Sequence, residues 1–186
     1  AAPVRTGDEL EDNYPTMSFG ELTEGTKYDR HPYVIDRLLR EAEVMNIIAS
    51  PKTGKSFLTY GMALALATGG EWIGYKAAKN LKVLIVDNEL HRGELASRVR
   101  MVAKEMNVNP VDSLHFNMLR GADVDIYELD KKLEEIDAGQ FDIIVIDALY
   151  RVLPSGMNEN SNTDLTKVFN KLDAIASKFN VALINI

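Results

Sequence analysis

The residues at 49–56 combine a short loop, a cation and a hydroxyl group, and read Ala49-Ser50-Pro51-Lys52-Thr53-Gly54-Lys55-Ser56. An apolar run precedes this segment at 44–48, and a helix-forming run follows it at 57–68. A loop that ends on a helix N-terminus presents unpaired N–H groups and the positive end of the helix dipole to an anion. Gly54 permits a close backbone approach, Lys55 can reach the β- and γ-phosphates, and Ser56 can ligate Mg²⁺. The segment is therefore predicted to bind a nucleoside triphosphate with Mg²⁺.

One position departs from the general phosphate-loop pattern G-x-x-x-x-G-K-[ST], because Ala49 stands where the first glycine is usual. Alanine is the mildest replacement if that position does not need a positive φ. The alternative interpretation is a chance Gly-Lys-Ser sequence in a turn, but the flanking strand and helix favour the phosphate loop. We predict that the nucleotide contacts all of 49–56 and the next residue, Phe57, and that Lys55 also contributes to catalysis.

Carboxylates follow two other apolar runs. Asp147 ends the run at 143–146 and is predicted to bind Mg²⁺, directly or through water, because parallel sheets place their ligand sites at the carboxyl ends of strands. Asp87 and Glu89 end the run at 83–86, where a carboxylate can polarise the water that attacks the γ-phosphate. The spacing leaves open which of the two does so. The alternative for all three residues is a structural role as turn or helix caps.

Apolar strand-like runs alternate with helix-forming runs along most of the chain. Alternation of this kind predicts an α/β fold, with a mostly parallel, doubly wound sheet and helices on both faces. The segments 31–39 and 72–75 are expected to be an apolar lead and a short loop. Strands are predicted at 44–48, 82–87, 114–119, 141–147 and 181–186, and helices at 55–68, 91–106, 126–138 and 163–179. Four methionines on apolar faces are interpreted as core residues: Met45, Met62, Met101 and Met106.

The two ends of the chain differ from this pattern. Residues 1–30 are polar and carry a carboxylate cluster, so we expect an irregular arm that docks only at points such as 17–19. Residues 31–186 are predicted to form one core domain. Because a domain does not normally finish in a core strand, the run ending at Ile186 predicts that C-terminal strands are missing.

Composition narrows the classes of protein. The 186 residues are 46% hydrophobic and 26% charged, which is typical of a globular domain. The absence of cysteine excludes disulfides and thiolate metal sites, and His31, His91 and His115 are too dispersed for a metal cluster. A formal charge of -7 gives no global basic footprint, so contact with DNA would be local or belong to an assembly. No apolar span is long enough for a bilayer, and Ala1-Ala2-Pro3-Val4 lacks signal-peptide features, so a soluble, cytoplasmic protein is expected.

Several motifs together resemble a known family. The phosphate loop, the sequence Val-Leu-Ile-Val-Asp-Asn-Glu-Leu at 83–90, the turn at 119–121 and the run 141–151 look like the RecA-like AAA-type ATPases related to the RepA plasmid replicative helicase. This resemblance implies that ATP is the nucleotide and that Glu89, rather than Asp87, is the catalytic carboxylate. It also implies a functional arginine on the following helix, for which Arg98 matches best and Arg100 less well; the alternative is a solvated helix face. Arg151 stands where related sequences often carry arginine, without an assigned role.

The same resemblance implies a homo-oligomer, with a hexameric ring suspected, that hydrolyses ATP and acts on DNA as a helicase in replication or repair. Two alternatives remain open from the residues: an ATPase that acts on a protein partner, and a nucleotide-dependent switch or scaffold with little turnover. Family members carry a sensor histidine and an arginine finger on strands beyond the equivalent of Ile186. The loop at 155–162 is interpreted as solvated, with a partner or DNA loop as the alternative.

Overall fold

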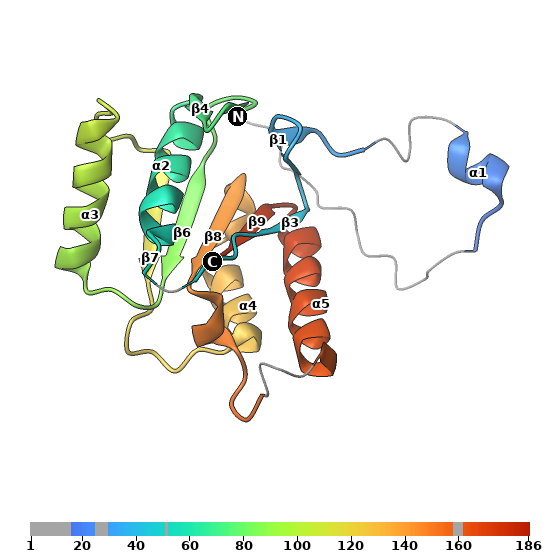
Figure 1. Ribbon diagram of the computed structural model, residues 1–186. Coiled ribbons are helices and arrows are strands. Elements are labelled where there is room, and N and C mark those ends of the chain that lie inside the picture. The colour runs from blue at the N-terminus through green and yellow to red at the C-terminus, as the bar shows by residue number, and fades with distance from the viewer. Residues whose placement is uncertain (1–15, 25–29, 51, 158–161) are drawn as a thin grey trace.

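The computed structural model describes residues 16–24, 30–50, 52–157 and 162–186. Its centre is a five-stranded sheet in which every neighbouring pair of strands is parallel (Figure 1). This sheet confirms the predicted α/β class, a RecA-like P-loop NTPase core. From one edge to the other the strands are β3 (Val44–Asn46), β9 (Ala182–Asn185), β8 (Ile143–Asp147), β6 (Val83–Asp87) and β7 (Leu114–Met118).

Helices cover both faces of this sheet (Figure 1). On one face lie α2 (Lys55–Ala67) and α3 (Arg92–Glu105), which contact each other. On the other face lie α4 (Ile126–Glu135) and α5 (Asn162–Phe179), which also form a pair. The helix predicted over 126–138 ends earlier because Asp137 has a left-handed φ of 52° and begins the 3₁₀ turn η1 (Ala138–Gln140).

The side chains of the strands alternate between two apolar layers. Within β6, Val83 and Ile85 pack on the α2 side, whereas Leu84 and Val86 pack on the side of α4 and α5. A strand covered on both faces needs apolar residues at every position, which explains why β6 and β8 are continuous apolar runs in the sequence.

Two of the four predicted core methionines are not core residues. The side chains of Met101 and Met106 are 55% and 37% exposed, because α3 lies over the outer part of the sheet and fully buries only Leu95. Met62 is fully buried, and Met45 is partly buried against the core, as predicted.

Two short hairpins replace segments that we expected to be irregular. The apolar lead at 31–39 contains β1 (Tyr33–Ile35), which pairs with β2 (Leu39–Arg40). The loop at 72–75 joins β4 (Glu71–Trp72) to β5 (Tyr75–Lys76). Its turn residues, Ile73 and Gly74, have φ values of 43° and 87°, the left-handed backbone that a two-residue hairpin requires.

The described part of the N-terminal arm also differs from expectation. Residues 19–23 form a short helix, α1 (Phe19–Thr23), because Ser18 and Glu21 make a reciprocal capping box at its start. The side chain of Phe19 is 83% exposed and α1 buries no residue, so the expected docking through Phe19 is wrong. The rest of the predicted arm, at 1–15 and 25–29, lies outside the described residues. No helix of the described ranges is both long and apolar enough to cross a membrane.

Candidate active site

The carboxyl ends of β3, β6 and β8 lie at the same end of the parallel sheet, where a cleft of about 980 Å³ opens. Within the sheet Asp87 pairs in register with Asp147, so the two carboxylates start from adjacent backbones. The loop after β3 closes one side of this cleft. The predicted site residues that line it are Ala49, Lys52, Thr53, Gly54, Lys55, Ser56, Phe57, Glu89, Arg98 and Asp147.

The loop backbone is shaped for an anion. Lys52 and Gly54 have φ values of 62° and 89°, and Gly54 stands at the N-terminal cap of α2 without any side-chain cap. The first N–H groups of a 13-residue helix therefore face the cleft. Ala49 has no positive φ, which is the condition under which alanine can replace the usual glycine.

Side chains hold this loop in shape. The Lys55 ammonium donates to the carbonyl oxygens of Ala49, at 2.5 Å, and Ser50, at 3.5 Å. The hydroxyl of Thr53 also donates to the Ser50 carbonyl, at 2.7 Å. Ser50 thus shapes the loop through its backbone and does not line the cleft, while Pro51 lies outside the described residues.

Asp147 is a buried carboxylate beside the loop. It is only 4% exposed and is hydrogen-bonded with Ser56. Burial raises the pKa of Asp147 to about 6; the negative charges of Asp87 and Glu89 add to this effect, while Ser56 and Lys55 oppose it. A carboxylate in these surroundings is stabilised by a nearby cation.

The donor set fits Mg²⁺, a hard cation that prefers oxygen ligands. The Ser56 hydroxyl and the Asp147 carboxylate meet at the cleft, and Asp87 Oδ2 is buried without a hydrogen-bond partner in the described structure. Among the described residues no group of three or more His, Cys, Asp or Glu side chains could hold a metal by themselves. Bound Mg²⁺ would therefore need phosphate or water oxygens to complete its coordination, as in nucleotide sites.

Asp87 and Glu89, which the sequence left as competitors, lie in different places. Asp87 is 1% exposed, and its Oδ1 accepts from the backbone N–H groups of Glu89, at 3.0 Å, and Leu90, at 2.7 Å. Asp87 therefore caps the turn that follows β6. Glu89 instead extends its side chain into the cleft, where it is 32% exposed.

The Glu89 carboxylate has partners that the sequence did not indicate. The Tyr150 hydroxyl donates to Glu89 Oε1, and Arg151 Nε lies 3.5 Å from the same oxygen and 3.2 Å from the Tyr150 hydroxyl. Arg120 donates to the backbone carbonyl of Glu89. The hydrogen bond to Glu89 raises the pKa of Tyr150. Tyr150 and Arg151 belong to η2 (Leu149–Val152), directly after β8, so the sequence offered only the unassigned Arg151 as a signal.

Asn88 joins the ends of the two central strands. Its amide donates to the Ala148 carbonyl at 3.1 Å, and its side-chain oxygen accepts from the Ala148 N–H at 2.9 Å. Because both groups are buried, this pair fixes the turn that carries Glu89 to the turn that carries Tyr150. No local pattern in the sequence indicates this role of Asn88.

Arg98 reaches the cleft from α3. Its guanidinium bonds Glu94 at 2.7 Å and stands 5.7 Å from the centre of the Phe57 ring, so Arg98 is not simply on a solvated face. The hydrogen bond to Glu94 raises the pKa of Arg98. Arg100 lines a different groove.

Tyr60 is a buried residue of α2 that does not line the cleft. It is fully buried, and its hydroxyl has no hydrogen-bond partner in the described structure. Burial and the nearby charges of Asp147 and Asp87 raise the pKa of Tyr60.

The loop at 49–56, the buried carboxylate of Asp147 and the accessible carboxylate of Glu89 lie together at the carboxyl end of a parallel sheet. This arrangement is typical of a P-loop nucleotide site. A family model described as an AAA domain matches residues 13–186. The chain therefore belongs to the AAA domain family, whose members are P-loop ATPases. No curated protein sequence matches the chain significantly.

Proposed function

We propose that this chain is a Mg²⁺-dependent ATPase that converts ATP and water into ADP and phosphate in the cleft. The observation that carries the proposal is the convergence of Lys55, Glu89 and Asp147 on one cleft, from the first residue of α2, the turn after β6 and the end of β8. The three side chains are respectively a cation, an accessible carboxylate and a buried carboxylate, which are the groups that phosphoryl transfer to water requires.

The loop would seat the phosphate chain. The N–H groups of the first turn of α2 face the anion, and the Lys55 ammonium exchanges carbonyl acceptors for phosphate oxygens. Ser56 and Asp147 would hold Mg²⁺, which when bound supplies positive charge to the phosphate oxygens. Phe57 and Arg98 form the outer wall on the α3 side.

Glu89 would act as the general base. It accepts a proton from the water whose oxygen attacks the γ-phosphorus, while the bond from phosphorus to the bridging oxygen of ADP breaks. Tyr150 and Arg151 fix one carboxylate oxygen of Glu89, and Asp87 fixes the turn beneath it. Arg98 would contribute positive charge as negative charge develops on the leaving group.

We further propose that the protein is related to the RepA plasmid replicative helicase and works on DNA as a ring-shaped homo-oligomer. The order of motifs from the phosphate loop to Arg151 supports this relation. With a net charge of -7 per chain, cations on several copies would have to be gathered around a DNA strand. A ring provides that arrangement.

Phosphate release from ATP with and without single-stranded DNA tests the proposal. We expect Mg²⁺-dependent turnover that DNA increases several-fold and that a chelator abolishes. If DNA leaves turnover unchanged, the proposed action on DNA is wrong and an ATPase that acts on a protein partner is favoured. Tight ATP binding without turnover would contradict hydrolysis and favour a nucleotide-dependent switch.

A further inference from the structure

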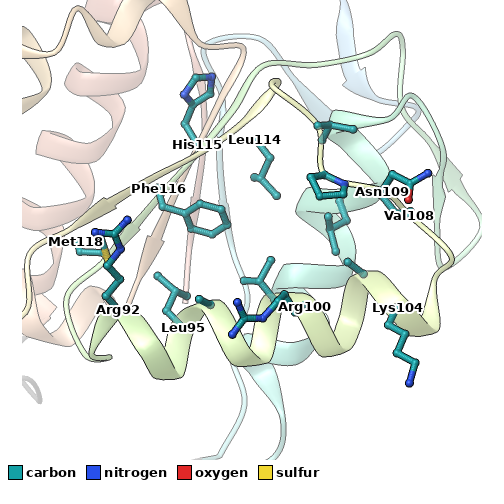
Figure 2. Close-up of a pocket in the computed structure, with 16 residues that line it drawn as sticks. Arg92, Leu95, Arg100, Lys104, Val108, Asn109, Leu114, His115, Phe116 and Met118 are labelled. Carbon is teal, nitrogen blue, oxygen red and sulfur yellow. The ribbon is translucent and has the colours of Figure 1, made fainter.

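A second hollow lies outside the proposed nucleotide site, between α3 and β7. It is a groove of about 810 Å³, and in Figure 2 Leu95 of α3 and Leu114 and Phe116 of β7 point into the space between the two elements. Arg98, which belongs to the nucleotide cleft, does not line it. The groove therefore offers an apolar surface that the proposed ATPase chemistry does not use.

The rim of this groove is basic. Its sixteen lining residues include Arg92, Arg100 and Lys104 and no aspartate or glutamate. All three cations lie along α3 and are exposed (Figure 2). The chain has 28 acidic and 21 basic side chains, yet none of the acidic ones lines this groove. An acidic segment with apolar side chains would match this surface in charge and in hydrophobicity.

The N-terminal arm of the chain contains such a segment. Residues 8–12 read Asp-Glu-Leu-Glu-Asp, which gives four carboxylates around Leu10, and Tyr14 follows two residues later. Carboxylates can pair with the three cations, while Leu10 and Tyr14 are suited to an apolar groove. We call residues 8–14 the acidic segment.

The described part of the arm and the groove lie on opposite sides of the molecule (Figure 1). The arm leads into the β1–β2 hairpin, after which the chain enters the central sheet at β3, one edge strand, whereas the groove lies at β7, the opposite edge. Four strand spacings, about 19 Å, separate these edges. Figure 1 shows α1 at the end of the molecule opposite to α3 and β7. An arm at one edge and its matching groove at the other form a head-to-tail pair of surfaces.

We propose that the acidic segment of one copy docks in the α3–β7 groove of a second copy. Leu10 and Tyr14 fill the apolar floor, and the carboxylates of residues 8–12 pair with the cations of α3. The arm thereby links neighbouring chains. Because the contacts at the rim are exposed ion pairs, the linkage weakens as salt increases.

Cross-linking tests the proposal, since the natural chain has no cysteine. Asn13→Cys labels the arm, and Asn109→Cys labels the groove without removing an apolar contact. Equal amounts of the two single variants are mixed and treated with a short bismaleimide. We expect a covalent dimer. A double variant that cross-links within single chains, with no dimer in the mixture, would overturn docking between copies, and no cross-link at all would overturn docking altogether.

Charge exchange tests the chemistry of the contact. Arg100→Glu with Lys104→Glu in the groove chain should lower the dimer yield about tenfold, because two attractions become repulsions. Glu9→Lys with Glu11→Lys in the arm chain should do the same, and the two reversed chains mixed together should recover the dimer. Lys131→Glu with Lys167→Glu, exposed on the opposite face, is the matched control and should have no effect. Failure of the reversed pair to recover would overturn the assigned surface, whatever the ATPase activity.

Discussion

The Lys55 ammonium donates to two carbonyl oxygens of the phosphate loop, those of Ala49 and Ser50. Phosphate oxygens are stronger acceptors, so nucleotide binding replaces a neutral contact by a charged one. We predict that Lys55→Ala weakens ATP binding by about 2 kcal/mol or more, measured by calorimetry. Lys131→Ala, an exposed change far from the cleft, is the control. Equal ATP affinity of the Lys55 variant and the parent would remove the phosphate-loop assignment.

Asp147 links the site to stability through pH. In the folded protein the pKa of Asp147 is about 6, above the ordinary value of 3.8, so ionisation of Asp147 lowers the free energy of unfolding. The contribution of protonated Asp147 to stability is fully present below about pH 4 and is lost as the pH rises through 6. Without Mg²⁺, Asp147→Asn should therefore stabilise the protein at pH 7.5 by about 2 kcal/mol and change it little at pH 4. Urea unfolding in a chelator measures this. A loss of stability at pH 7.5 would show that the carboxylate is structural, and an unchanged Mg²⁺ titration of ATP binding would contradict its role as a ligand.

The main elements could be predicted because each has a local cause. Strands β6 and β8 are buried on both faces, and this burial requires continuous apolar runs. Helix α2 begins directly after Gly54 of the phosphate-loop motif, which marks its start in the sequence. The two hairpins were missed because strands of two or three residues carry too few side chains for a pattern. The exposure of Met101 and Met106 depends on where α3 crosses the sheet, which helical spacing does not reveal.

The site was predictable in part for a similar reason. Lys55 and Ser56 follow from the phosphate-loop motif, and Asp147 follows from the end of an apolar run, both of which are visible in the sequence. Asp87 and Glu89 could be separated only in three dimensions, because the turn after β6 buries one and exposes the other. Tyr150 was missed because its partner, Glu89, is 61 positions away and no local spacing connects them.

At the scale of elements, Asp130 ties α4 to α5. It accepts from Lys171 at 2.5 Å and Lys178 at 2.8 Å; burial opposes its charge, but these bonds outweigh burial and lower the pKa of Asp130. This stability is present above the ordinary pKa and is lost as pH falls through the folded value. Asp130→Asn should cost about 1–2 kcal/mol at pH 7 and much less at pH 3. Chemical unfolding at both pH values tests this, with the exposed Asp173→Asn as control. An equal loss of unfolding free energy at pH 7 and pH 3 would show that the contribution of Asp130 does not come from its ion pairs.

Considered as a whole molecule, the chain has a cleft that is open on one side, and only a few of the described cations line this cleft. Lys52, Lys55 and Arg98 line it, and a positive group from a neighbouring copy would increase turnover by about 10³-fold. We predict that specific ATPase activity rises with protein concentration. Sedimentation with a non-hydrolysable ATP analogue should then show a ring, with a hexamer expected. A monomer whose activity per molecule is independent of concentration would exclude this assembly.

We propose that this cleft hydrolyses ATP with Glu89 as the base. Glu89→Gln keeps the size and hydrogen bonding of the side chain but removes its charge, whereas Asp87→Asn changes a buried cap. The most direct measurement compares ATP affinity and phosphate release for both variants and the parent. We predict that Glu89→Gln binds ATP like the parent and loses about 10²-fold or more in turnover, while Asp87→Asn loses less. If Asp87→Asn abolishes turnover and Glu89→Gln retains it, the assignment of the base is contradicted.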